Sequence, residues 1–261
     1  MPTADRKTAL ITGASFGIGL ELARIFAREG YNLVLVARSA DKLRQLASEL
    51  EKTHGTRSLI LAVDLTEPGA PAYVLDQTTR ADIHVDVLVN NAGFGQYGKF
   101  VENDLEECLR QIQLNVTTLT HLTHLYLPAM IERKSGRILN VASTAAFQPG
   151  PLMAVYYATK AYVLHFSEAI SNELQDTGIT VTCLCPGPTE TEFQKRANIS
   201  GIRLSKYGTM DARTVAEDGY RALIAGKTVA ISGFRNWLIA QSVRFAPRRM
   251  VAAVARKLQE E

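Results

Sequence analysis

The stretch that decides the fold is Thr12-Gly13-Ala14-Ser15-Phe16-Gly17-Ile18-Gly19, which joins the first apolar run to the first helix-periodic segment. Gly13 permits a tight turn, Gly17 permits a close backbone approach to a pyrophosphate, and Gly19 lets the helix lie against the strand. The positive end of the helix would face the phosphates. No Gly-Lys-Ser/Thr follows, which argues against a P-loop. A glycine-rich turn is weak evidence alone, but its place between first strand and first helix favours a dinucleotide site.

The composition is that of a globular protein. The chain has 261 residues, of which 46% are hydrophobic and 21% charged, with a formal net charge of +3. This hydrophobic content excludes intrinsic disorder, and the length suits one or two domains. There is no apolar run of about 18 residues, so no membrane-spanning helix is expected. The residues before the first apolar run leave no room for a signal peptide, which argues against secretion.

Buried-strand patterns alternate with helical patterns along most of the chain. The expected strands are Thr8–Thr12, Leu33–Ala37, Leu59–Val63, Val85–Asn90, Arg137–Ala142, Ile179–Cys185 and a weak Thr228–Ile231. The expected helices include Gly19–Arg28, Ser39–Glu51, Leu105–Arg133, Val155–Asp176 and Thr214–Gly226. This alternation predicts right-handed crossovers and a parallel sheet with helices on both faces.

Five further features carry chemistry. Asn90-Asn91-Ala92-Gly93 closes the fourth strand, Asn115 lies within a helix, and Ser143 follows the fifth strand. Tyr156 and Lys160 are four residues apart and share one helix face, where an ammonium would lower the pKa of the phenol. Each has an ordinary alternative: Asn115 could satisfy a neighbouring backbone group, and a Tyr-xxx-Lys pair is most often an exposed helix pair.

Taken together, these features resemble the short-chain dehydrogenase/reductase family, and the resemblance runs from Lys7 to about Thr191. The stretch 12–19 matches the family's TGxxxGIG cofactor motif, 90–93 its NNAG, and Pro186-Gly187 its PG. The family's catalytic Asn, Ser, Tyr and Lys are all present.

The resemblance assigns roles to four residues. Tyr156 would donate a proton to the substrate carbonyl oxygen as hydride arrives, and Ser143 would hydrogen-bond that oxygen. Lys160 would hold the ribose hydroxyls, and Asn115 would order a water that relays protons to Lys160. Tyr157 also lies near Lys160 in sequence, but the family spacing selects Tyr156.

The resemblance also implies a cofactor site. Its expected contacts are Gly13, Ser15, Gly17, Ile18, Gly19, Arg38, Asp64, Leu65, Asn91, Ala92, Gly93, Tyr156, Lys160, Pro186, Gly187, Thr189 and Thr191. NAD-binding members carry an acidic residue where Ala37 stands, and Arg38 offers a guanidinium to a 2′-phosphate. NADP(H) is therefore expected in preference to NAD(H), the alternative being that Arg38 is merely solvated.

The expected substrate side is mostly apolar, which favours an apolar ketone or aldehyde. Its members are Phe94, Tyr97, Ala145, Phe147 and Phe193. Loop aromatics more often simply pack their loop, and no residue identifies the substrate. The long irregular stretch after Pro186 is typical of a functional lid. His121 and His124 lack a third ligand, so no metal site is expected.

The C-terminal segment at 235–261 is basic and amphipathic. Within Asn236–Leu258, apolar residues alternate with five basic ones and no acidic one, and Pro247 interrupts the pattern. Three roles remain open: a peripheral membrane contact, a cap on the substrate pocket, or packing on a partner subunit. Nucleic-acid binding is not expected, because no recognition motif is present.

We therefore expect one Rossmann-type, doubly wound α/β domain over residues 1–234, with about seven strands in the order 3-2-1-4-5-6-7, and a helical extension over 235–261. The expected function is NADP(H)-dependent interconversion of a carbonyl and an alcohol. The alternative is a non-catalytic dinucleotide-sensing or scaffold protein. The resemblance implies a homodimer or homotetramer. Three widely spaced cysteines, Cys108, Cys183 and Cys185, indicate reduced thiols and a cytoplasmic location.

Overall fold

The computed structural model describes residues 6–192 and 208–260. A seven-stranded parallel sheet forms the centre of the molecule, in the order β3-β2-β1-β4-β5-β6-β9. Its strands are β1 (Thr8–Thr12), β2 (Asn32–Ala37), β3 (Ser58–Ala62), β4 (Val87–Asn90), β5 (Gly136–Val141), β6 (Ile179–Cys185) and β9 (Val229–Ile231). A separate two-stranded pair joins β7 (Thr189–Glu190) to β8 (Met210–Asp211). The predicted doubly wound α/β fold and its strand order are confirmed.

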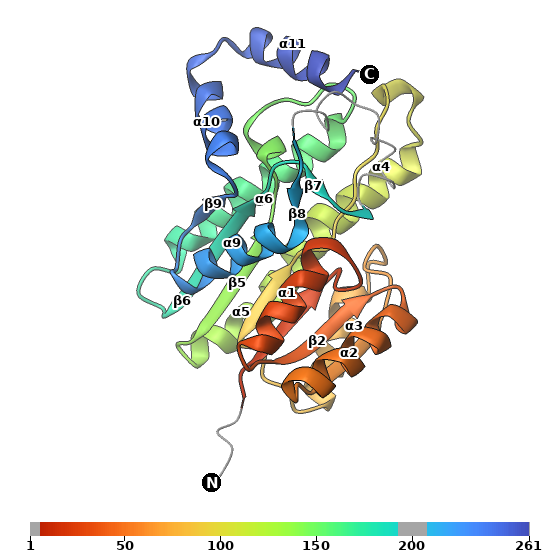
Figure 1. The fold of residues 1–261 in the computed structure, drawn as a ribbon, viewed down its shortest axis with the longest axis vertical. Helices are drawn as coiled ribbons and strands as arrows, with labels where there is room; N and C mark the ends of the chain where they lie inside the picture. The colour runs from red at the N-terminus through yellow and green to blue at the C-terminus, as the bar shows by residue number, and fades with distance from the viewer. Residues whose placement is uncertain (1–5, 193–207, 261) are drawn as a thin grey trace.

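Helices cover both faces of the sheet (Figure 1). They are α1 (Gly17–Arg28), α2 (Ala40–His54), α3 (Ala70–Arg80), α4 (Leu105–Ile112), α5 (Leu119–Glu132), α6 (Ala154–Glu173), α9 (Ala212–Ile224), α10 (Phe234–Ser242) and α11 (Arg248–Gln259). Short helical turns lie at η1 (Phe100–Glu102), η2 (Gln113–Thr118), η3 (Thr144–Phe147) and η4 (Val243–Phe245). Helices α1, α2 and α9 pack on one face of the sheet, while α3 and α5 pack on the other.

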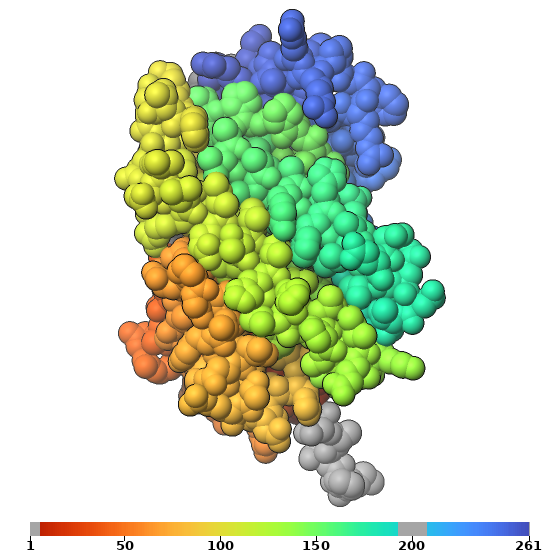
Figure 2. All heavy atoms as spheres, turned by 180° about the vertical axis from the view of Figure 1, so that it is seen from behind, coloured from red at the N-terminus to blue at the C-terminus, as the bar shows by residue number. Residues whose placement is uncertain are grey.

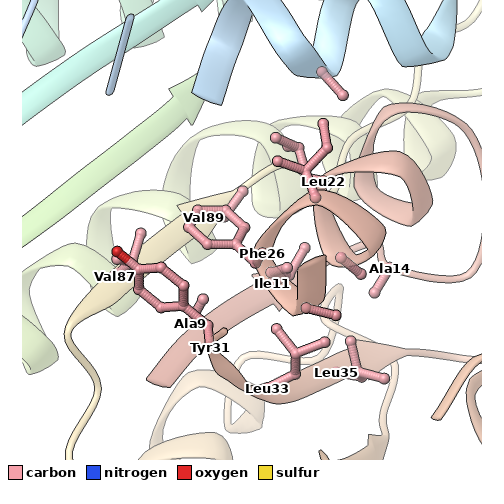
Figure 3. Packing of buried hydrophobic residues seen from close by; sticks show 14 of the residues in the cluster. Ala9, Ile11, Ala14, Leu22, Phe26, Tyr31, Leu33, Leu35, Val87 and Val89 are labelled. Carbon is pink, nitrogen blue, oxygen red and sulfur yellow. The ribbon is translucent and has the colours of Figure 1, made fainter. Parts of the chain in front are cut away.

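The core on the α1 face is built around Phe26 (Figure 3). The rings of Phe26 and Tyr31 meet edge to face at 5.1 Å, and Tyr220 contacts Phe26 from α9 at 5.2 Å. Such edge-to-face pairs stabilise the fold by more than the burial of their apolar area alone would do. This packing fixes α1, and with it the glycine-rich turn before it, against the centre of the sheet.

Two helical predictions need correction. The predicted helix 105–133 is divided into α4 and α5 by a π-helical turn, η2, which inserts an extra residue around Asn115. Helix α3 was not predicted. Pro71 in its first turn is typical of a helix start, but the second half of the helix, from Asp76 to Arg80, is polar. Helices α10 and α11 form the predicted extension, and in Figure 1 they lie, in blue, at one end of the molecule.

Candidate active site

The glycine-rich turn forms a backbone cradle at the carboxyl end of β1. Gly13 and Gly17 both have positive φ, +67° and +59°, a conformation that other residues rarely adopt. A Cβ on Gly17 would lie 2.8 Å from the Thr191 side chain, so the turn and the 189–191 segment approach too closely for any larger residue. Gly19 lies behind this cradle instead of lining it, because its Cα packs against the carbonyl of Gly13.

Thr12 and Asn91 join this turn to the neighbouring strand β4. The Thr12 hydroxyl accepts hydrogen bonds from the backbone amides of Asn91 and Ala92, at 2.9 and 3.0 Å. The Asn91 side chain in turn donates to the carbonyl of Thr12 at 2.8 Å. These bonds hold the 90–93 motif beside the glycine turn, as the sequence motifs predict.

Three charged residues, Arg38, Asp64 and Arg110, line the same cavity. Asp64 Oδ2 lies 3.8 Å from Arg38 Nη1 and 3.6 Å from Arg110 Nη2. Burial by itself would raise the pKa of Asp64, but hydrogen bonds from the Thr66 amide and hydroxyl, together with the two arginines, lower it below its usual value. Asp64 is therefore ionised at neutral pH. Thr66 and Arg110 were not predicted, since Arg110 lies on α4 and no sequence motif points to it.

Ser143, Tyr156 and Lys160 meet at the carboxyl end of β5. The phenol of Tyr156 is hydrogen-bonded to the Ser143 side chain, and Lys160 Nζ lies 5.7 Å from the centre of the Tyr156 ring. Lys160 Nζ donates a 2.8 Å hydrogen bond to the carbonyl oxygen of Val141. The three side chains thus come from the end of a strand and from the helix that packs against it.

The pKa values of these groups follow from burial. Burial raises the pKa of Tyr156 to about 12, although the Ser143 hydrogen bond opposes the shift. Burial also lowers the pKa of Lys160 to about 8, with the nearby thiols of Cys183 and Cys185 opposing it. The lowered phenol pKa expected from the Tyr-Lys pair is therefore not found, because the Lys160 ammonium bonds to Val141 and desolvation dominates the pKa of Tyr156.

Tyr157 has different surroundings from Tyr156. Its ring is buried against Gly150, where an added Cβ would lie 2.1 Å from it. Burial and the neighbouring Tyr156 hydroxyl raise the pKa of Tyr157 well above its usual value. The hydrogen bond to Ser143 belongs to Tyr156, so this geometry agrees with the family spacing.

Asn115 is buried in the π-helical turn and is fully hydrogen-bonded within the protein. Its side-chain oxygen accepts from the Phe94 amide at 3.1 Å, and its nitrogen donates to the Phe94 carbonyl at 2.9 Å and to Thr159 Oγ1 at 3.1 Å. A Cβ on Gly93 would lie 3.0 Å from Asn115 Oδ1 and 3.5 Å from Lys160 Nζ. Asn115 thus fixes the loop after β4 immediately beside Lys160.

The Pro186-Gly187 segment closes another side of the site. The carbonyl of Pro186 accepts a 2.8 Å bond from the Thr144 amide, and the Thr189 hydroxyl bonds to the carbonyl of Gly187 at 2.9 Å. Gly187 also lies against α10, where a Cβ would be 2.3 Å from the Asn236 side chain. The C-terminal extension therefore touches the loop that is expected to hold the cofactor.

The expected substrate residues are placed unevenly. Tyr97 packs in one apolar cluster with Ala145, Met153 and both Tyr156 and Tyr157. The Tyr97 hydroxyl donates a 2.7 Å hydrogen bond to the carbonyl oxygen of Gln259 in α11.

Three other predicted substrate residues have separate outcomes. Phe94 lines the cavity. Phe147 does not face the part of the cavity wall that the structure describes; it packs behind η3 against the core between α6 and β6. Phe193 lies outside the described residues.

A single cavity of about 550 Å³ connects these parts. Its described wall includes the expected contacts Gly13, Ser15, Gly17, Ile18, Arg38, Asp64, Leu65, Asn91, Ala92, Gly93, Tyr156, Lys160, Pro186, Gly187, Thr189 and Thr191. Its volume is in the range of small-molecule and cofactor sites. The backbone cradle at the N-terminus of α1 fits the pyrophosphate of a nicotinamide dinucleotide, and the guanidinium groups of Arg38 and Arg110 line the same cavity. Within residues 6–192 and 208–260, no cluster of side chains suits a metal ion.

Comparison with known proteins gives the same result as the geometry. A sequence model of the short chain dehydrogenases matches residues 7–200. The ketoacyl reductase HetN of Nostoc sp. is 33% identical over 232 residues, which cover 88% of this chain and 79% of that protein. The very-long-chain 3-oxoacyl-CoA reductase of Bos taurus is 34% identical over 191 residues, covering 72% of this chain. The matched part is 61% of the bovine protein's length.

A solved structure with a bound cofactor has the same fold. A short-chain dehydrogenase from Sphingobium yanoikuyae in complex with NADPH is 34% identical, with a TM-score of 0.81 over 92% of this chain and 94% of that one. The bulky-bulky ketone specific alcohol dehydrogenase from Comamonas testosteroni is 32% identical, with a TM-score of 0.78 over 93% of each chain. The chain therefore belongs to the short-chain dehydrogenase/reductase family of oxidoreductases, which use nicotinamide dinucleotides.

Proposed function

We propose that this protein reduces an apolar ketone or aldehyde to the alcohol, and reverses that reaction, using NADP(H). The observation that carries the proposal is the meeting of Ser143, Tyr156 and Lys160 at one cavity with the glycine cradle. Relatives named as a ketoacyl reductase and a bulky-ketone alcohol dehydrogenase support a carbonyl substrate. The apolar cluster around Met153 and Tyr97 supports an apolar one.

The chemistry divides between cofactor and protein. When bound, NADPH supplies the hydride that the carbonyl carbon accepts. The Tyr156 phenol donates the balancing proton to the carbonyl oxygen, and Ser143 holds that oxygen through a hydrogen bond. Lys160 holds the ribose hydroxyls, as the family resemblance implies. A phenol with a pKa of about 12 is protonated at neutral pH and can therefore donate its proton when the carbonyl is reduced.

Two features support NADP(H) over NAD(H). Ala37 at the end of β2 leaves no carboxylate to repel a 2′-phosphate, and Arg38 beside it is more than half exposed to the cavity and solvent. Arg110 adds a second positive charge to the same end of the cavity. A bidentate guanidinium is a favourable partner for a phosphate.

A homo-oligomer is also proposed. Leu105, Leu109 and Ile112 of α4 are between 40% and 62% exposed, and a shallow apolar groove lies beside them between α6 and Phe100. Family members use the corresponding helices as a subunit interface, as the sequence resemblance implies. Changing Leu109 to Glu should lower the sedimentation coefficient to that of a smaller species. An unchanged coefficient would place the interface elsewhere.

The function is tested by following NADPH absorbance with a panel of aliphatic, aromatic and polycyclic ketones and aldehydes. Turnover of apolar members is expected. If the protein binds NADPH but oxidises it with no member of the panel, the proposal fails and a dinucleotide-sensing or scaffold role takes its place.

A further inference from the structure

The C-terminal segment, blue in Figure 2, lies at one end of the molecule. Several of its apolar side chains are exposed. Phe245, between α10 and α11, is 89% exposed, and Phe234 at the start of α10 is 74% exposed. Trp237 stacks on Phe234 at 5.9 Å and is itself about half exposed. Together with Leu238, Met250 and Val254, these residues define what we term the C-terminal surface. Exposed apolar side chains gathered in one segment of a chain indicate an interaction site.

The charge of this segment is of one sign. Residues 234–259 contain no Asp or Glu, while Arg244, Arg248, Arg249 and Lys257 are exposed beside the apolar side chains. Arg256 pairs with Glu260 at the very end of the segment. Two copies of this surface placed face to face would bring like charges together, which is unfavourable. An anionic layer would instead satisfy both the basic and the apolar side chains.

The two helices have the form of interfacial helices. In α11, Val251, Ala255 and Gln259 face the protein and are buried, whereas Met250 and Val254 are half exposed. No helix in the described part of the chain is long and apolar enough to cross a bilayer. Short amphipathic helices with aromatic, apolar and basic side chains lie in the headgroup region of a membrane.

The C-terminal surface is connected to the candidate active site. Through the backbone of Gln259, α11 accepts the hydrogen bond of Tyr97, which belongs to the same apolar cluster as Met153 and Tyr156. Through Asn236, α10 lies against Gly187 at the cavity wall. Attachment at this surface would therefore place the apolar end of the cavity close to the lipid.

We propose that the C-terminal surface docks this protein on an anionic lipid membrane. The evidence for docking is the exposed apolar and basic side chains of this surface, and it does not depend on the proposed function. Its consequence, that the carbonyl substrate is drawn from the lipid phase, rests on the proposed function. Docking and reduction can therefore fail separately.

Binding is measured with the full chain and sedimented vesicles of phosphatidylcholine, with and without phosphatidylserine. Trp237 is the chain's single tryptophan and lies on this surface, so brominated phosphatidylcholine should quench the protein's fluorescence. Binding to the serine-containing vesicles and quenching in them are both expected. Absence of either result would overturn the proposal.

Two variants locate the contact. The triple change Arg244→Gln, Arg248→Gln and Arg249→Gln should weaken binding to anionic vesicles about a hundredfold, since each arginine near such a surface contributes a factor of about five. Phe245→Ser should weaken it about tenfold, because a large side chain no longer enters the lipid. Phe245 is too exposed for its loss to disturb folding.

A matched control has the same net charge as the triple variant. Arg44→Gln, Arg80→Gln and Arg221→Gln remove three exposed arginines from α2, α3 and α9 and should leave vesicle binding within about threefold. Equal losses in both triple variants would mean that net charge alone drives binding, and would overturn the assignment. So would a change in sedimentation coefficient of the Phe245 variant without lipid, which would make this surface an interface between copies.

Discussion

The ammonium of Lys160, on α6, donates a 2.8 Å hydrogen bond to the carbonyl oxygen of Val141, the last residue of β5. This bond fixes a buried charge at the carboxyl edge of the sheet, beside the Tyr156 ring. Burial lowers the pKa of Lys160 from 10.5 to about 8. Burying the Lys160 ammonium therefore lowers the stability of the folded protein at neutral pH.

Changing Lys160 to Met tests this cost through pH. Between pH 8 and 10.5 the unfolded parent still binds the lysine proton while the folded parent has released it, so the parent's stability rises with pH. The variant lacks this group. We expect the free energy of unfolding of the parent, relative to the variant, to increase by up to about 3 kcal/mol over this window. Denaturant titrations at a series of pH values measure the difference.

Lys134→Met removes an exposed lysine from the surface and is the control for that series. If the difference in free energy of unfolding between the parent and Lys160→Met stays constant from pH 8 to 10.5, the ammonium of Lys160 is not destabilised by burial.

Changing Arg38 to Ala tests the cofactor preference. The parent should use NADPH with a higher kcat/KM than NADH. In the variant the ratio of these two kcat/KM values should fall about tenfold, because one charge-assisted contact to the phosphate is lost. Arg44→Ala, on the exposed face of α2, is the matched control and should leave the ratio unchanged. A parent that uses both cofactors equally would contradict this assignment of Arg38.

Changing Tyr97 to Phe tests the connection between the cavity and α11. The variant loses the 2.7 Å bond to the Gln259 carbonyl, which is worth about 1 kcal/mol. Amide hydrogen exchange in 248–259 should then become about fivefold faster. Tyr73→Phe, on exposed α3, should change nothing there. Unchanged exchange in the Tyr97 variant would show that α11 is held by its apolar face alone.

The central strands of the sheet could be predicted, because they are buried on both faces and their sequences are largely apolar. The run at 33–37 is an example: it lies inside β2, whose central residues are fully buried. The break at Asn115 could not be predicted, because the apolar period continues through it. The π-helical turn depends on the bonds of Asn115 to Phe94 and Thr159, which are distant in sequence.

The candidate site likewise contains residues that the sequence could predict and residues that it could not. Residues within motifs, such as Gly13 and Tyr156, are placed together at the cavity as predicted. Arg110 and the bond between Tyr97 and Gln259 were missed, since each depends on a contact between remote segments. Phe147 was misplaced because sequence alone does not show which side of η3 it faces.

The central claim is that Tyr156 is the proton donor of a carbonyl reductase. Its most direct test is kcat/KM for NADPH-dependent reduction of an apolar ketone by the parent, Tyr156→Phe and Tyr157→Phe, with NADPH affinity measured in parallel. Tyr156→Phe should lower kcat/KM by at least about a hundredfold with NADPH affinity nearly unchanged, because one hydroxyl leaves the chemistry. Tyr157→Phe should have a mild effect. Near-parental reduction by Tyr156→Phe, or loss of reduction in Tyr157→Phe instead, would contradict the claim.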